Sequence, residues 1–178
     1  MRHLLSTWWV CRREWGQIWE GSRLSFHGRA FDRLLPRLSE RVQEISRERQ
    51  RLPGLIARLR ACPPGERRAF LQSDRDFRSW LFCEWLIEES QGLLYADPGR
   101  AEELAAGAVT LAGNLDPGLY SDSLVNDLRA RSWAFMGEVL RVLSELRRAE
   151  EAFATAEDFI FQGTGDVLEE ARLLELKA

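Results

Sequence analysis

Apolar residues recur at every third or fourth position along most of this 178-residue chain. This spacing is typical of amphipathic α-helices, and no segment sustains the alternation of apolar and polar residues that predicts a strand. The pattern therefore predicts an all-α chain. A first predicted helix ends near Gly21 and carries an apolar stripe made of Leu4, Trp8, Cys11, Trp15 and Ile18.

Helix-breaking residues divide the rest of the first half. A second helical region runs from about residue 27 to residue 51 and is interrupted or restarted around Pro36. Pro53 suits the first turn of a separate short helix, which the run Cys62-Pro63-Pro64-Gly65 ends. A short basic helix is predicted at about residues 66–71.

Capping signals mark the next helices. Ser73, with Asp76 three residues later, resembles a capping box for a long helix through Trp80 and Leu86. Asp97 and Pro98 together predict the start of a helix over residues 98–112. A turn is predicted at Asp116-Pro117-Gly118.

The last third of the chain predicts three more helices. Two of them run from Leu124 to Leu143 and from Leu146 to Ile160. Gly163-Thr164-Gly165 closes the second helix through the tolerance of glycine for positive φ. Asp166 and Glu169 resemble a capping box that opens a terminal helix to Leu176.

A spaced set of large and small residues accompanies these helices. Trp133, Gly137, Ala149, Phe153 and Ala156 fall where a tetratricopeptide repeat places its Trp, small, Ala, Phe and Ala residues. Residues 130–163 therefore resemble one such repeat, which is a hairpin of two helices. The resemblance implies a tetratricopeptide-like, helical-hairpin solenoid, and we expect the first region to form an N-terminal helical cap.

Two weaker repeats flank this one. An earlier and degenerate repeat over about residues 82–113 places Trp85, Ala101 and Ala108 at matching positions, while Glu89 replaces the small residue. An incomplete repeat begins at residue 164. We therefore expect a basic helical region at residues 1–72 that packs on repeats at residues 73–178.

Longer motifs resemble a bacterial group of tetratricopeptide-like proteins. They read Asp127-Leu128-Arg129-Ala130-Arg131-Ser132-Trp133-Ala134, Ala149-Glu150-Glu151-Ala152-Phe153 and Gly163-Thr164-Gly165-Asp166. Proteins of this kind often begin with a His-Leu-Leu-x-x-Cys-x-x-Cys element that resembles the zinc finger of anti-sigma factors. Here Trp8 stands at the first Cys position, after His3 and before Cys11, so too few donors are left for zinc and we expect no metal.

Charge is divided unevenly along the chain. The net charge is −3, but residues 1–78 hold seventeen Arg against nine acids, or +8, and residues 79–178 hold eight basic residues against nineteen acids, or −11. Such polarity favours head-to-tail contact, an acidic partner for the first half, or mutual neutralisation on folding. Neutralisation together with solvated helix faces is the favoured interpretation.

The composition also bears on location. No run is long and apolar enough to span a bilayer, and Arg12 and Arg13 end the apolar stretch near the start without a cleavage site. Three cysteines without paired spacing suit a reducing compartment. We expect a cytoplasmic protein with no membrane contact.

Catalytic chemistry has little support in the residues. His3 and His27 are the chain's two histidines, and neither lies in a recognisable motif. Gly16 and Gly21 have the spacing of a phosphate loop, but the Lys and the preceding strand are absent. We expect a protein that is not an enzyme and that needs no cofactor.

Binding is the expected function. In repeats of this kind the first helix of each hairpin builds the concave wall, so the resemblance implies that Arg131, Glu138, Arg141 and Arg172 face a partner. Trp8 and Trp15 are further candidate anchors, although a role in capping the first hairpin is favoured for them. The terminal helix lacks a covering second helix, which predicts self-association or a partner helix on Leu168, Leu173, Leu174 and Leu176.

The sequence thus predicts a scaffold or adaptor that holds a protein or peptide in a bacterial regulatory or stress-response complex. The alternative is a nucleic-acid-associated transcriptional regulator that uses the basic first half. This alternative is disfavoured because the aromatic residues lie in the apolar stripe and not among the arginines, so no stacking surface is evident.

Overall fold

The computed structural model describes the backbone of residues 28–177 and the side chains of residues 42–177, and all regular elements in this part are helical. The predicted all-α class is confirmed there. The predicted first helix, with His3, Trp8, Cys11 and Trp15, lies outside the described residues. The helices are α2 (Gly28–Ala61), α3 (Arg67–Ser73), α4 (Trp80–Leu93), α5 (Pro98–Gly113), α6 (Pro117–Tyr120), α7 (Asp122–Val142), α8 (Leu146–Phe161) and α9 (Val167–Lys177), with 3-10 turns η1 (Pro64–Glu66) and η2 (Arg75–Phe77).

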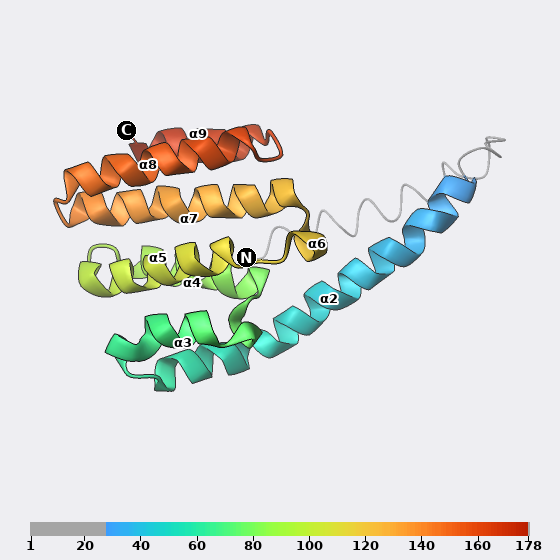
Figure 1. Cartoon of the computed structure of the whole chain (residues 1–178), viewed down its shortest axis with the longest axis horizontal. Coiled ribbons are helices and arrows are strands. Elements are labelled where there is room, and N and C mark those ends of the chain that lie inside the picture. Colours follow the sequence, from blue (N-terminus) through green and yellow to red (C-terminus); the bar gives the residue numbers. More distant parts are fainter. Residues whose placement is uncertain (1–27, 178) are drawn as a thin grey trace. The chain divides into compact units, whose positions relative to one another are not determined.

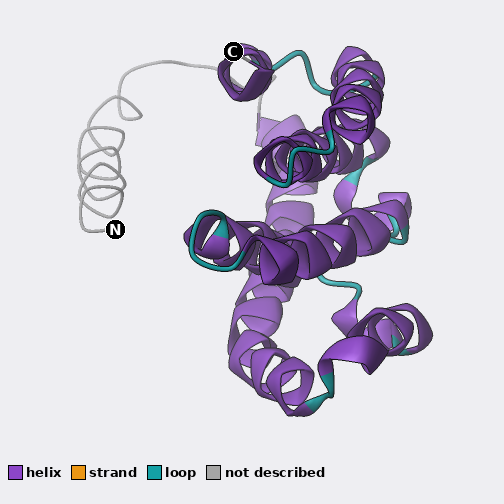
Figure 2. Cartoon of the chain, turned by 90° about the vertical axis from the view of Figure 1, so that its left-hand side faces the viewer, coloured by secondary structure: helices purple, strands orange, loops and turns teal. Residues whose placement is uncertain are grey.

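Contacts divide the chain into residues 1–45 and residues 46–178. Within the second unit, α4 and α5 pack as one hairpin and α7 and α8 as another, and α5 lies against α7 (Figure 1). α9 then packs on both α7 and α8, while α3 packs on α5. The hairpins are stacked in the order of the sequence, as the labels and colours of Figure 1 show, and Figure 2 shows helices joined by loops throughout the described residues. This order brings α4, α7 and α9 onto a shared face.

The prolines of α2 do not have the effect that the sequence predicts. α2 is continuous from Gly28 to Ala61, so Pro36 does not restart it and Pro53 does not begin a separate helix. A proline inside a helix removes one hydrogen bond and can kink the helix without ending it, provided that the residues around it favour the helix. The Cys62-Pro63-Pro64-Gly65 run does end α2, as predicted.

The start of α4 is also different from the prediction. Ser73 ends α3, and the residue that caps α4 is Ser79, whose hydroxyl accepts a hydrogen bond from the N–H of Phe82. The 3-10 turn η2 (Arg75–Phe77) instead lies between the two helices, and Asp74 caps it by accepting from the N–H of Asp76. Ser73 lies three residues before an acid, Asp76, whereas Ser79 lies directly before the apolar run Trp80-Leu81-Phe82, so each serine carries a different signal of a helix start.

The other capping predictions are confirmed at α5 and in part at α9. The Asp97 carboxylate accepts from the N–H of Arg100 at 3.1 Å and begins α5. Asp166 accepts from the N–H of Leu168 at 2.9 Å at the start of α9, and Gly165 takes a φ of 75°. Glu169 does not complete a capping box, because its carboxylate binds Arg131 instead.

Small residues set the distance between the helices of each hairpin. A Cβ atom added to Gly137 would lie 2.8 Å from the ring of Phe153 in α8, so only glycine fits there without a shift. Ala149 and Ala156 are also buried in this hairpin, and Ala101 and Ala108 are fully buried in the hairpin of α4 and α5. These residues occupy the packing positions that their spacing predicts.

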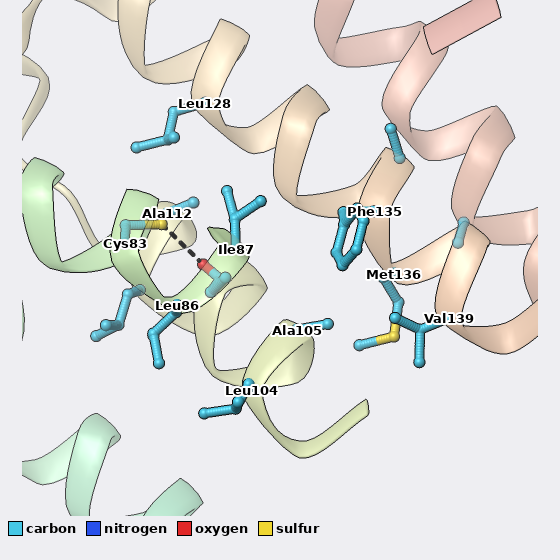
Figure 3. Close-up of a cluster of buried hydrophobic side chains, with 14 of the residues drawn as sticks. Cys83, Leu86, Ile87, Leu104, Ala105, Ala112, Leu128, Phe135, Met136 and Val139 are labelled. Atoms are coloured by element: carbon cyan, nitrogen blue, oxygen red, sulfur yellow. Dashed lines mark hydrogen bonds between the residues drawn. The ribbon is translucent and has the colours of Figure 1, made fainter. Parts of the chain in front are cut away.

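One continuous core joins the hairpins. Leu86 and Ile87 of α4 and Phe135 and Met136 of α7 lie in the same buried cluster (Figure 3). Cys83 is fully buried there, and its thiol lies 3.4 Å from the carbonyl oxygen of Ala108, to which it donates. The sequence prediction that this cysteine is a packing residue and not half of a disulfide is consistent with its free, buried thiol.

A polar cluster fixes α2 against the start of α4. The carboxylate of Glu48, which is 8% exposed, accepts from the hydroxyl of Ser79 at 3.0 Å and from the N–H of Leu81 at 3.3 Å. The hydroxyl of Tyr120 also donates to Glu48. The start of α4 and the end of α6 therefore converge on one buried carboxylate of α2.

Candidate partner-binding groove

A groove of about 200 Å³ opens on the face that α4, α7 and α9 share. These three helices are the first helices of the two hairpins and the terminal helix. The resemblance predicts that such first helices form a wall that faces a partner, and this stays a prediction. The groove is lined by Glu84, Ile87, Glu88, Gln91, Arg131, Phe135, Arg172 and Leu176.

Arg131, one of the lining residues, connects the three helices. Its Nη1 donates to Glu84 of α4 at 2.9 Å, and its Nε and Nη2 donate to the two carboxylate oxygens of Glu169 of α9 at 3.2 and 2.5 Å. The two parallel bonds to Glu169 use the planar fork of the guanidinium. Arg131 therefore holds α4, α7 and α9 in a fixed relation.

The electrostatic setting of Arg131 strengthens this role. Burial disfavours its charged form, but the hydrogen bonds and charges of Glu169 and Glu84 outweigh burial and raise the pKa of Arg131 above its ordinary value. Its side chain is 21% exposed and that of Glu169 is 13% exposed. A partly buried ion pair of this kind is screened by salt less than an exposed pair.

The remaining lining offers a mixed surface to a ligand. Ile87 and Phe135 are buried and form an apolar floor, with Leu176 partly buried beside them. Glu88 and Gln91 are exposed on α4, one helical turn apart. Such a surface binds the side chain of a polypeptide through apolar contact and a few polar groups.

Asp127 of α7 forms two hydrogen bonds with the turn before α9. The carboxylate of Asp127 accepts from the N–H of Thr164 at 3.0 Å and from its hydroxyl at 2.7 Å. A Cβ atom added to Gly163 would collide with the same carboxylate. Asp127 and Arg131 lie one turn apart on α7, so the conspicuous motif at residues 127–134 and the Gly163-Thr164-Gly165-Asp166 motif meet in space.

The sequence-predicted partner residues fall into separate places. Arg131 and Arg172 line the groove. Glu138 is 6% exposed and accepts from Arg141 at 2.7 Å, so these two residues bind each other and do not line the groove. Trp8 and Trp15 lie outside the described residues.

Arg141 lies instead beside another hollow, of about 320 Å³, at the ends of α7 and α9. Leu146, Ala149 and Phe153 of α8 give this hollow a largely apolar lining. Leu146 is 62% exposed, whereas Ala149 and Phe153 are buried. Glu157 and Lys177 form an ion pair at its edge.

The leucines of the terminal helix divide between two environments. Leu173 is buried and Leu176 packs against the core, so the prediction that both lack a cover is wrong for them. Leu168 and Leu174 are 73% and 67% exposed, as predicted. They lie on the face of α9 that turns away from α7 and α8, because Leu173 and Leu176 occupy the inner face.

Several arginines of the first half are engaged in contacts within residues 46–178. Arg58 pairs with Asp74 and Asp76 and lies 5.1 Å from the centre of the Phe77 ring. The hydrogen bond from the N–H of Asp76, together with Arg58, lowers the pKa of Asp74. Arg60 and Arg67 pair with Glu89 and Glu103. Mutual neutralisation between the basic and acidic parts is thus observed at these two pairs.

Within residues 42–177, no group of three His, Cys, Asp or Glu side chains is arranged to hold a metal ion. No helix in the described part of the chain has the length and apolar character of a membrane span. Comparisons with protein-family models, with curated proteins and with solved structures give no match for this chain.

Sequence reasoning missed the part of the groove that α4 supplies. Glu84, Glu88 and Gln91 follow one another at spacings of four and three, which places them on one helix face. That spacing was available in the sequence. What it could not give was the pairing of this face with Arg131 and Arg172, because those contacts join residues far apart in the chain.

Proposed function

We propose that residues 46–178 act as a non-enzymatic scaffold that binds a segment of another protein in the groove formed by α4, α7 and α9. The observation that carries this proposal is the groove itself, in which an apolar floor is flanked by charged residues from α4, α7 and α9. Arg131 and Asp127 tie those helices together, so the groove is formed before a partner arrives. A preformed site loses less conformational entropy on binding.

The tetratricopeptide-like interpretation supports the same function. Gly137 against Phe153, together with the buried alanines of both hairpins, agrees with the packing positions of such repeats. Stacked hairpins of this kind leave a face of first helices available to a ligand. We extend the proposal to an adaptor role in a bacterial regulatory or stress-response complex, which rests on the resemblance of the motifs.

A substitution that fills the groove with a large side chain tests this proposal. Gln91→Trp places a large ring on the exposed wall of α4, and Arg147→Trp places the same ring on α8, where Arg147 is 92% exposed and outside the groove. Tagged wild-type protein and both variants are purified from the native cell, and the retained proteins are quantified by mass spectrometry.

We expect a set of proteins that the wild type and Arg147→Trp retain in equal amounts and that Gln91→Trp loses. Circular dichroism of the two variants checks that each is folded. If all three forms retain the same proteins in the same amounts, the groove is not the binding surface.

A further inference from the structure

The charges that line the groove do not all remain available to a ligand. Arg131 is bound to Glu84 and Glu169, and Nη1 of Arg172 lies 3.5 Å from Glu169. These two cations and two anions neutralise one another. Glu88 has no ion pair among the described residues, so its carboxylate is the uncompensated charge of the groove lining.

The apolar floor lies beside that carboxylate. Ile87 precedes Glu88 on α4, and Phe135 of α7 and Leu176 of α9 complete the apolar part of the lining. A volume of about 200 Å³ accommodates a long side chain. The arrangement therefore suits a side chain with an apolar stem and a charged end, such as that of arginine or lysine.

The net charge of the residues around the groove is negative, like that of Glu88. Residues 46–178, the unit that carries the groove, hold seventeen basic residues and twenty-three acids, a balance of −6. A field of this sign attracts a cationic segment and repels an anionic one before contact is made.

We infer that the occupant of the groove is a basic polypeptide segment, one of whose arginine or lysine side chains lies along Ile87 and Phe135 with its cationic end at Glu88. The inference rests on the proposed function and names the chemistry of its partner. Arg131 and Arg172 do not oppose it, because Glu84 and Glu169 hold their guanidinium groups.

Fluorescence anisotropy with defined probes tests the inference on the full chain. The probes are a short labelled peptide of alternating alanine and arginine and the matching peptide of alanine and glutamate. Glu88→Gln removes the charge in the groove and keeps the size of the side chain. Glu150→Gln removes one exposed charge from α8, outside the groove, and has the same effect on net charge.

We expect the arginine peptide to bind and the glutamate peptide not to bind. Loss of a charge-assisted contact weakens binding by about tenfold, so Glu88→Gln should raise the Kd by about that factor, while Glu150→Gln should change it less than about twofold. Equal losses in the two variants would show that the peptide senses only the general field, and would overturn the inference. Absence of binding, or equal binding of the glutamate peptide, would overturn it as well.

The two proposals fail separately. If Gln91→Trp releases proteins in the native-cell experiment but the arginine peptide does not bind, the groove is a binding surface for a partner of different chemistry. If the arginine peptide binds through Glu88 but Gln91→Trp releases no protein, the inference of a basic ligand is supported and the proposed scaffold function in the cell is contradicted.

Discussion

Arg131 of α7 binds Glu169 of α9 through two nitrogens, at 3.2 and 2.5 Å, and so joins the terminal helix to the body of the repeats. The same guanidinium reaches Glu84 of α4 at 2.9 Å. The sequence predicts Arg131 as a partner contact. In the structure its bonds are internal, and they fix the positions of α4, α7 and α9, which line the groove. A partner would meet a surface that Arg131 organises.

This relation predicts the effect of Arg131→Met. The variant keeps much of the apolar stem but leaves Glu84 and Glu169 without their cation in a partly buried site, so we expect the free energy of unfolding to fall by about 1–3 kcal/mol. Arg147→Met removes an ion pair whose members are 92% and 66% exposed, and should cost less than about 0.5 kcal/mol. Urea denaturation measures both, and equal values would contradict the role of Arg131.

Gly137 gives a second prediction. An alanine there would bring its Cβ to 2.8 Å from the ring of Phe153, so Gly137→Ala should overpack the hairpin of α7 and α8 and cost about 1–3 kcal/mol. Gly92→Ala is the matched control, since nothing lies within 4 Å of its added Cβ on α4. This control should stabilise the protein by about 0.5–1 kcal/mol, because alanine favours the helix. If thermal melts showed that the melting temperature shifts in the same direction in both variants, the hairpin register would be wrong.

The two tyrosines allow a test of the cluster around Glu48. Tyr120→Phe removes a hydroxyl that donates to the buried Glu48 carboxylate, and should lower the free energy of unfolding by about 1–3 kcal/mol. Tyr95→Phe changes a side chain that is 80% exposed and should have an effect within about 0.5 kcal/mol. Equal denaturation midpoints for the two variants would show that the cluster does not stabilise the fold.

Cys83 predicts a dependence on pH and on thiol reagents. Burial raises the pKa of its thiol from 9.0 to about 12, so the folded protein keeps this proton over a range in which the unfolded chain releases it. The contribution of Cys83 to the free energy of unfolding therefore falls as the pH rises from about 9 to about 12. Iodoacetamide labelling near pH 8, read by mass spectrometry, should modify the partly exposed Cys62 and leave Cys83 intact until urea is added. Equal labelling rates in the native protein would contradict this burial.

Apart from the continuity of α2, the helices and their packing positions are predictable from the sequence because they depend on local signals. Asp97 caps α5 through a bond to a residue three positions away, and Gly137 and Phe153 lie within one hairpin. The local pattern favours Ser73 as the cap of α4, because an acid follows Ser73 at the third position and Phe82 follows Ser79, but the observed cap is Ser79. The buried acceptor Glu48, which also binds Ser79, lies thirty-one residues away and is invisible to such a pattern.

The groove was accessible only in part for the same reason. Of the four residues predicted to face a partner, Arg131 and Arg172 line the groove, whereas Glu138 and Arg141 bind each other. Partner contact by any of them stays a prediction. The partners of Arg131 lie forty-seven and thirty-eight residues away, on α4 and α9. Helical periodicity gives the face on which a residue lies but does not give the residue that meets it from another helix.

Site-specific photo-crosslinking shows whether a protein partner lies along α4, α7 and α9. A benzoylphenylalanine is placed at Gln91 in the groove or at Arg147 on α8, and irradiated native cells are analysed for crosslinked proteins. We predict a discrete crosslinked protein from position 91 that is absent from position 147. Crosslinks of the same identity and yield from both positions, or a discrete product from position 147 alone, would contradict the account.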